Sequence, residues 1–364
     1  MPNTITNSTL FSGNIFVFSA FDVGDDINLE KVALLPTITT IPFILPKNFK
    51  NYHTPLAIDI PYTNVTAKKA VSCKIHNFGA ISLIYKVPFV STLHDISNTL
   101  QKVVNEHLEQ SYTDVKAVFN QIDQYILKPK FFDTRSSYTV IQVEPQPDLI
   151  SVAQLQETHG SAIASMLRFE TESLSEEQKN DILDSAIGYF RGDLIIVDTD
   201  ATFAYESDFP EVQDFFEFAN IQQLELKFFD RFLDAQLNKI YEEGTQRLPF
   251  KSYLPFIGIA HDPVADLGKI KVDISVICER LESIIKVGGE PYVAELYGLL
   301  VQKLDLKNWQ HAIDRKLTII HDIRMVYQHK TDAVREDLLS MLIIVLIFIE
   351  LVIGALNYMK VVSH

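Results

Sequence analysis

Cysteine, tryptophan and glycine are scarce in this 364-residue chain, which contains 2, 1 and 13 of them respectively. Cys73 and Cys278 stand far apart and in no metal-ligand spacing, so the sequence predicts two structural thiols and no disulfide framework. The chain also lacks a glycine-rich phosphate loop and the H-x-x-x-H and H-E-x-x-H metal motifs. We therefore expect no bound cofactor.

Basic residues are outnumbered as well, with 32 Lys and Arg against 47 Asp and Glu and a net charge of -15. Such a chain repels phosphate backbones, so nucleic acid is not an expected partner. The N-terminus "MPNTITNSTLFSGNIFVFSAF" has neither a basic region nor a long apolar run. It predicts neither a secretory signal nor a transit peptide.

One long apolar run is present near the end of the chain, "LLSMLIIVLIFIELVIGAL" at residues 338–356. As a helix, its 19 residues would be about 28 Å long, close to the thickness of a bilayer's hydrocarbon core. Its 14 Leu, Ile, Val and Phe residues favour insertion by roughly 5–6 kcal/mol, against at most roughly 3 kcal/mol for one acidic residue. The sequence predicts a single membrane-spanning helix at 338–357; the alternative is a buried core helix.

The flanking charges predict the orientation of this helix. Arg324, Lys330 and Arg335 precede it, whereas Lys360 alone follows it. By the positive-inside rule, the large N-terminal part lies on the cytoplasmic side of a single-pass, tail-anchored protein.

Glu350 lies inside the apolar run and needs a proton or a partner there. Gly354 and Ala355 follow about one turn later and would let two helix backbones approach closely. We expect self-association through Glu350 and Gly354, which makes the chain a homo-oligomer. The alternative is that Glu350 extends to the outer interface and contacts no other helix.

Before the anchor, the pattern predicts an α+β protein that begins with a mixed α/β domain at residues 1–148. Its strand-like segments are "NIFVFSAFDV", "LAIDIPY", "VSCKIHNFG", "AISLIYKVPF" and "SYTVIQVEP". Asn77 and Gly79 indicate a hairpin turn, and apolar residues at helical spacing predict a long helix from residue 91 to 127. A ferredoxin-like arrangement is a candidate for this domain.

Two further segments separate this domain from the membrane. Residues 149–209 predict a helical segment, with an S-x-x-E capping box from Ser173 to Glu176, followed by a β-hairpin. Residues 210–337 predict two long helices, at 210–243 and from Pro291 onward, and the second has no breaker before the membrane segment. These helices form an antiparallel hairpin, or pack on their copies in another subunit.

The strongest chemical motif is "LIIVDTDATF", an apolar strand followed by Asp198, Asp200 and Thr202. It resembles the first motif of the haloacid-dehalogenase-type phosphotransferases, a resemblance that implies Asp198 as nucleophile and Asp200 as acid/base around Mg²⁺. Asp262 and Asp266 in "FIGIAHDPVAD" resemble that family's metal-binding acidic motif. The alternative is a plain β-hairpin, with "LIIVD" and "TFAYE" as arms and "TDA" as the turn. We favour the hairpin, and therefore no catalytic or metal residue.

Several segments together resemble a group of uncharacterised bacterial membrane proteins, namely "DLIIVD", "FEFANIQQLELKFFDRFLD" and "LDLKNWQHAIDRKLTIIHDI" running into "EDLLSMLIIVLIFIELVIGAL". The ending, with Glu350 in its apolar segment, also resembles the "required for meiotic nuclear division" family. This resemblance implies a membrane-anchored, oligomeric, non-enzymatic protein. "IGALN" weakly resembles the Gly-Met-Asn signature of the magnesium-channel family, although a second membrane helix is missing.

The sequence thus predicts a membrane-anchored, oligomeric scaffold or interaction protein without catalytic activity. The enzyme alternative is a Mg-dependent phosphotransferase using Asp198, and an ion channel is the third candidate.

Overall fold

The computed structural model describes residues 9–44, 54–60, 68–131, 135–146, 150–188, 190, 192–206, 209–245, 272 and 291–362. Two compact units divide the chain. The first contains Met1–Phe229 and Ile274–Gln310, and the second contains Asp230–Asp273 and His311–His364.

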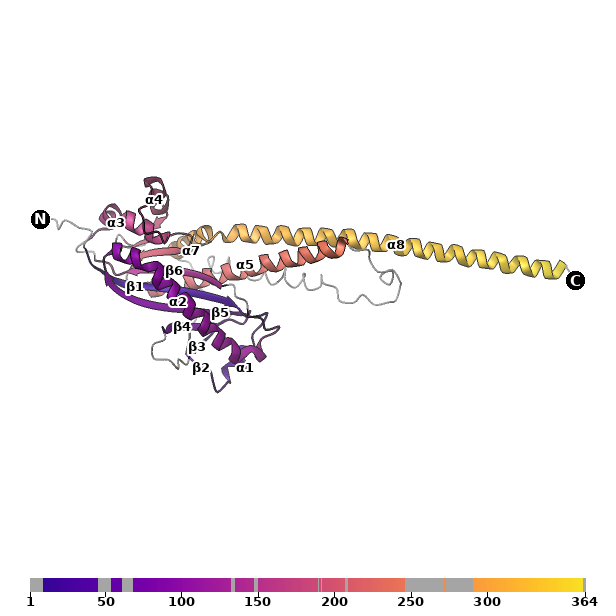
Figure 1. Cartoon of the computed structure of the whole chain (residues 1–364), viewed down its shortest axis with the longest axis horizontal. Coiled ribbons are helices and arrows are strands. Elements are labelled where there is room, and N and C mark those ends of the chain that lie inside the picture. Colours follow the sequence, from indigo (N-terminus) through magenta and orange to yellow (C-terminus); the bar gives the residue numbers. More distant parts are fainter. Residues whose placement is uncertain are drawn as a thin grey trace. The chain divides into compact units, whose positions relative to one another are not determined.

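The N-terminal part of the first unit is a β-α-β-β-α-β arrangement with a small two-strand insertion (Figure 1). Its elements are β1 (Phe11–Asp22), α1 (Leu29–Ala33), the inserted β2 (Thr39–Thr40) and β3 (Leu56–Asp59), β4 (Ala70–Ile75), β5 (Ala80–Ser91), α2 (Leu93–Ile122) and β6 (Arg135–Val143). The four main strands have the order β4-β5-β1-β6, and all neighbours are antiparallel. This is the order of the ferredoxin-like fold, so that interpretation of the sequence is confirmed.

The same sheet continues beyond β6. After α3 (Val152–Leu167), α4 (Glu176–Leu183) and the short β7 (Ala186–Ile187), β8 (Leu194–Val197) and β9 (Ala201–Tyr205) form an antiparallel hairpin. Strand β9 pairs in parallel with β6, which gives the sheet order β2-β3-β4-β5-β1-β6-β9-β8-β7. Residues 149–209 were expected to be a segment of their own, but this pairing joins them to the N-terminal domain. The α+β class is confirmed.

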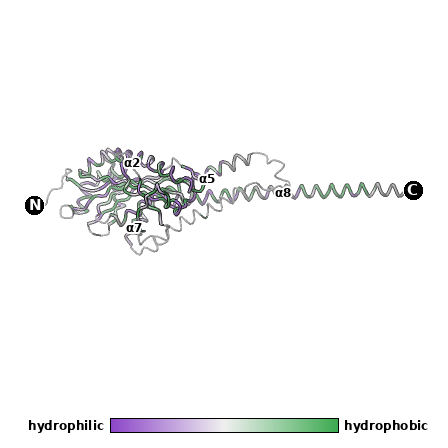
Figure 2. Tube along the Cα trace, turned by 90° about the horizontal axis from the view of Figure 1, so that it is seen from below, coloured by the Kyte–Doolittle hydropathy of each residue, from purple (hydrophilic) through white to green (hydrophobic). Residues whose placement is uncertain are grey.

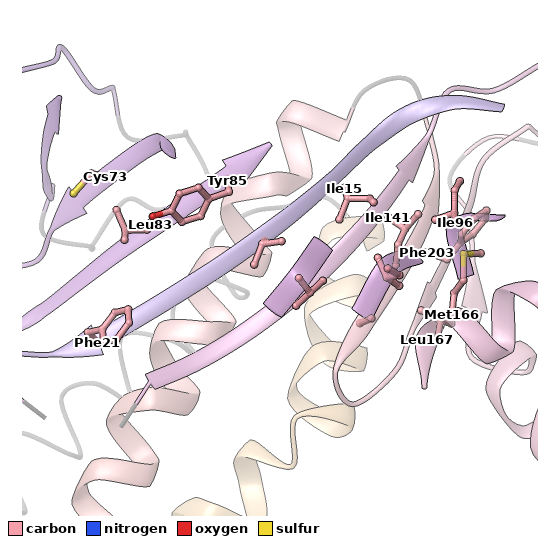
Figure 3. Packing of buried hydrophobic residues seen from close by; sticks show 14 of the residues in the cluster. Ile15, Phe21, Cys73, Leu83, Tyr85, Ile96, Ile141, Met166, Leu167 and Phe203 are labelled. Carbon is pink, nitrogen blue, oxygen red and sulfur yellow. The ribbon is translucent and has the colours of Figure 1, made fainter. Parts of the chain in front are cut away.

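Alternation along β1 gives the sheet two buried faces. Ile15, Val17 and Phe21 belong to the main core on the α2 side, where Leu83, Ile141 and Phe203 from other strands join them (Figure 3). The alternate residues Phe16 and Phe18 contact Phe209 and Phe216 of α5 (Phe209–Thr245), with ring centroids 4.8 and 6.4 Å apart. Helices α2 and α5 therefore cover opposite faces of the sheet.

The helix expected from Pro291 onward is divided into α7 (Pro291–Lys303) and α8 (Leu306–Val362). The division lies at Asp305, whose φ of 58° ends one helix and whose carboxylate accepts a hydrogen bond from the Asn308 side chain. Aspartate adopts this left-handed conformation more readily than most residues do, so the chain turns there without a glycine or proline. From Leu306 onward the helix is continuous, as predicted.

The pairing of α5 with the later helices is confirmed, but the expected antiparallel direction is not. Gln223 of α5 donates to the carbonyl of Leu304, just before α8, and further along the chain Asp230 of α5 accepts a hydrogen bond from Lys316 of α8. Because the contact positions rise together, α5 and α8 run in the same direction (Figure 1). The two helices are not joined by a short turn: the chain between them includes α7, so nothing forces them to be antiparallel.

Side-chain caps mark the starts of the two short helices α1 and α4, and one cap lies two residues from its predicted position. Asn28 caps α1, and its side chain accepts the backbone N–H of Lys31. Helix α4 is capped by Ser175, which accepts the N–H of Gln178, and not by the predicted Ser173. Two overlapping serines satisfy the same pattern, and the one nearer the helix is used.

Candidate functional site

The D-x-D-x-T motif lies in the turn of the β8–β9 hairpin. The backbone N–H of Asp198 donates to the carbonyl of Ala201 at 2.9 Å, and the arms pair from Val197–Thr202 to Leu194–Tyr205. The Tyr138 hydroxyl lies 2.8 Å from both the Asp198 carbonyl and the Thr202 hydroxyl, which fixes the turn to β6. The predicted hairpin is therefore confirmed.

The Asp198 side chain is fully buried and lies between two cations. Arg168, just after α3, places Nε 2.5 Å from Oδ2, and Lys303, at the end of α7, places Nζ 3.8 Å from Oδ1. Burial raises the pKa of this carboxyl above its usual value, although Arg168, the Thr199 backbone N–H and Lys303 act in the opposite direction. These ion pairs join the ends of α3, β8 and α7. We call Asp198, Arg168 and Lys303 the Asp198 clamp.

The structure separates the other predicted site residues from Asp198. Asp200 is exposed to solvent, and its carboxylate accepts a hydrogen bond from the neighbouring Thr199 hydroxyl at 3.2 Å. Asp262 and Asp266 lie outside the described residues. Within the described part of the chain, no group of three or more His, Cys, Asp or Glu side chains is placed to hold a metal ion.

A second polar cluster, which sequence reasoning missed, lies between the sheet and α5. Lys74 of β4 places Nζ 2.6 Å from Oε2 of Glu217 and 3.0 Å from Oδ1 of Asp214, both on α5. The other oxygen of Glu217 accepts a 2.5 Å hydrogen bond from Ser82 of β5, and His76 lies 3.2 Å from that hydroxyl. We call these five residues the Lys74 network.

The contacts within the Lys74 network shift the pKa values of Lys74 and His76. Burial alone would lower the pKa of Lys74, but Glu217 and Asp214 outweigh burial and raise it. Burial and the neighbouring Lys74 charge lower the pKa of His76 to about 3, so its imidazole is neutral near pH 7. The Ser82 hydroxyl donates to Glu217 and both side chains are buried, so this contact between β5 and α5 helps to fix α5 to the sheet.

The sequence contains a signal for this network. Lys74 and His76 alternate along β4 and its extension, so both face the same side of the sheet, and Asp214 and Glu217 are spaced three apart on α5. Charged residues in a helical turn that also carries Phe215 and Phe216 predict buried partners, because the apolar residues indicate that the turn is covered. The pattern does not say which strand supplies those partners.

The membrane prediction concerns the last described helix. Glu336–Ala355 is long and apolar enough to cross a bilayer, with a mean hydropathy of 2.9 (Figure 2). None of it is buried within the chain. A buried core helix, the alternative, would have been covered by other elements. Glu350 is exposed, and a Cβ added at Gly354 would meet no atom within 4 Å.

Comparison with known proteins gives one family. The family model described as "Uncharacterized protein MJ0711, N-terminal domain" matches residues 12–211, from β1 to the start of α5. The uncharacterized protein MJ0711 of Methanocaldococcus jannaschii is 26% identical over 253 residues, which cover 69% of this chain and 75% of that protein. No solved structure matches the chain.

Proposed function

The chain belongs to the family of the MJ0711 N-terminal domain, and we propose that it is a membrane-anchored scaffold or interaction protein without catalytic activity. The observation that carries the proposal is the uncovered apolar helix Glu336–Ala355. An uncovered helix of this composition is unfavourable in water and favourable in lipid. The α+β domain and its α5 would be the part available to partners.

The proposal includes an orientation and an oligomeric state. The basic residues that precede the span support a cytoplasmic location for the large N-terminal part. Glu350 and Gly354 lie one turn apart on an uncovered helix, where a second copy would give the carboxyl group a hydrogen-bonding partner and let the backbones approach. The resemblance to the "required for meiotic nuclear division" family supports the oligomeric state and the membrane anchor.

Membrane anchoring is tested by expressing the full chain and a chain ending at Asp337, then washing the membranes at alkaline pH. We expect the full chain to remain with the membranes and the shortened chain to be released. Recovery of the full chain in the wash would contradict anchoring.

Self-association is tested separately by light scattering in mild detergent. We expect the full chain to be oligomeric and a Glu350→Leu variant to be monomeric, with Ser340→Leu near the other end of the span as the matched control. If wild type and both variants are monomers, Glu350 extends to the interface and self-association is excluded.

A phosphotransferase using Asp198 is the second candidate. It is favoured by the position of this carboxylate at a strand end, beside the cations Arg168 and Lys303. Its test is Mg²⁺-dependent hydrolysis of a phosphate monoester by wild type, Asp198→Asn and the exposed control Asp181→Asn. Activity lost only in Asp198→Asn supports the enzyme, and equal rates for all three chains exclude it.

A further inference from the structure

Two buried carboxyl groups outside the sites described above lie where α5 crosses the end of β1, near enough for the charge of Asp22 to act on Glu225. Asp22 is the last residue of β1 and Glu225 lies on α5, and their exposed fractions are only 4% and 3%. Asp22 pairs across the sheet with Ala80, which packs together with Ala20, Ile221 and Leu224. These small alanines let α5 approach closely, and the turn that carries Leu224 brings Glu225 beside Asp22.

The charges around this pair do not neutralise it. Asp22 accepts the backbone N–H of Gly24 at 3.2 Å, whereas Oε1 of Glu225 is buried and has no hydrogen-bond partner within the described structure. Lys130 attracts Asp22, Asp25 repels it, and Lys128 forms a 3.0 Å ion pair with Asp25. The Lys74 network, in contrast, places a buried ammonium directly between its two carboxylates.

We propose that Asp22 and Glu225 form a proton-operated latch, in which this turn of α5 stays docked on β1 while the pair holds a proton and is released when the proton leaves. A proton makes one carboxyl group a hydrogen-bond donor to the other, whereas two ionised carboxylates in a buried site repel strongly. The same helix continues to Thr245, and its later turns pair with α8 through Lys316. This inference does not depend on membrane anchoring.

The direction of the pH dependence follows from burial. Burial, and to a lesser degree Asp25, raises the pKa of Asp22 to about 7, and burial together with Asp22 raises the pKa of Glu225 well above its usual value. For a carboxyl group whose pKa is raised in the docked state, docking is strongest at acidic pH and weakens as the pH rises toward the docked-state pKa. For one proton, the equilibrium constant for release increases by up to about tenfold per pH unit across that range.

The latch is tested by hydrogen exchange of α5 in the full chain in mild detergent between pH 5 and 7. Opening constants for residues 218–229, corrected for intrinsic exchange rates, are compared between wild type and the Asp22→Asn/Glu225→Gln double variant. His76 also lies under α5 and has the opposite pH dependence, but it is common to both chains and cancels in the ratio. We expect the wild-type to variant ratio to rise about tenfold per pH unit.

The control is Glu217→Gln in the Lys74 network, which should loosen α5 at every pH and leave the pH dependence of the wild type in place. A wild-type to double-variant ratio that is constant with pH would overturn the latch. If the double variant does not fold, the infrared band of a protonated carboxyl group provides the second measurement. The part of this band that Glu225→Gln removes should be present at pH 5.5 and lost by pH 8.5; equal bands in wild type and Glu225→Gln at pH 5.5 would overturn the latch.

Discussion

Lys74 Nζ lies 2.6 Å from Oε2 of Glu217, so a buried ammonium of β4 contacts a buried carboxylate of α5 on one face of the sheet. The side chains are only 8% and 5% exposed, so solvent screens this pair little. A buried ion pair is costly to desolvate, and its main effect is to make the loss of either partner costly. It therefore fixes the position of α5 on the sheet more than it adds to stability.

Removing one partner of this pair should lower the free energy of unfolding more than removing both. We expect Glu217→Leu to lower the free energy of unfolding by about 3 kcal/mol, because Lys74 keeps its charge and retains only the partly exposed Asp214. The double variant Lys74→Met/Glu217→Leu should recover at least about 1 kcal/mol of that loss, since it leaves no unpaired ammonium. Urea unfolding followed by circular dichroism measures both.

The control for this pair is Glu176→Gln, because Glu176 is 81% exposed and pairs with Lys179 at the surface. It should change stability by less than about 0.5 kcal/mol. A double variant at least as unstable as Glu217→Leu would show that the pair itself, and not the unpaired charge, accounts for the loss.

The Asp198 clamp should contribute to stability through Arg168 more than through Lys303, because the two cation-to-oxygen distances are 2.5 and 3.8 Å. We expect Arg168→Met to cost about 1–3 kcal/mol, a range reduced because the Arg168 side chain is 35% exposed. Lys303→Met should cost less than Arg168→Met. Thermal unfolding of the two variants in parallel tests this order, and the reverse order would contradict the assigned geometry.

A backbone prediction concerns Gly79 in the β4–β5 turn. Its φ is +99°, and a Cβ there would lie 1.8 Å from the carbonyl oxygen of Gly24. Because the obstacle is backbone, we expect Gly79→Ala to lower stability by about 2 kcal/mol or more. Gly298→Ala in α7 is the matched control, since its Cβ meets no atom within 4 Å and alanine favours a helix. Equal melting temperatures for both variants would contradict the assigned turn.

His76 should make the protein less stable in acid. Its pKa is lowered to about 3 in the folded state by burial and by Lys74, so the unfolded chain binds a proton below pH 6.5 that the folded chain does not. This difference in proton binding lowers the free energy of unfolding by up to about 1.4 kcal/mol for each pH unit below 6.5. We expect the difference in stability between wild type and His76→Gln to shift by about that amount per unit between pH 6 and 5. Parallel urea titrations at the two pH values measure it, and a difference that does not change with pH would contradict a neutral, buried His76.

Sequence patterns were sufficient for the elements whose signals are local. The alternation in "NIFVFSAFDV", the helical spacing from residue 91 and the apolar composition after residue 337 each depend on residues close together in the chain. The sheet extension by β7, β8 and β9 was missed because strand pairing is non-local: β6 pairs with β9, and the sequence between them contains two helices.

The sequence by itself determined the α+β class, most element boundaries and the apolar C-terminal helix, because periodicity and hydropathy are properties of short segments. The tertiary structure alone decided the common direction of α5 and α8, the burial of Asp198 between Arg168 and Lys303, and the network at Lys74. Lys74 and Glu217 are 143 positions apart, and no local pattern specifies which buried charge will meet which. Only the folded chain brings them together, because each is stable in its buried position only when the other is present.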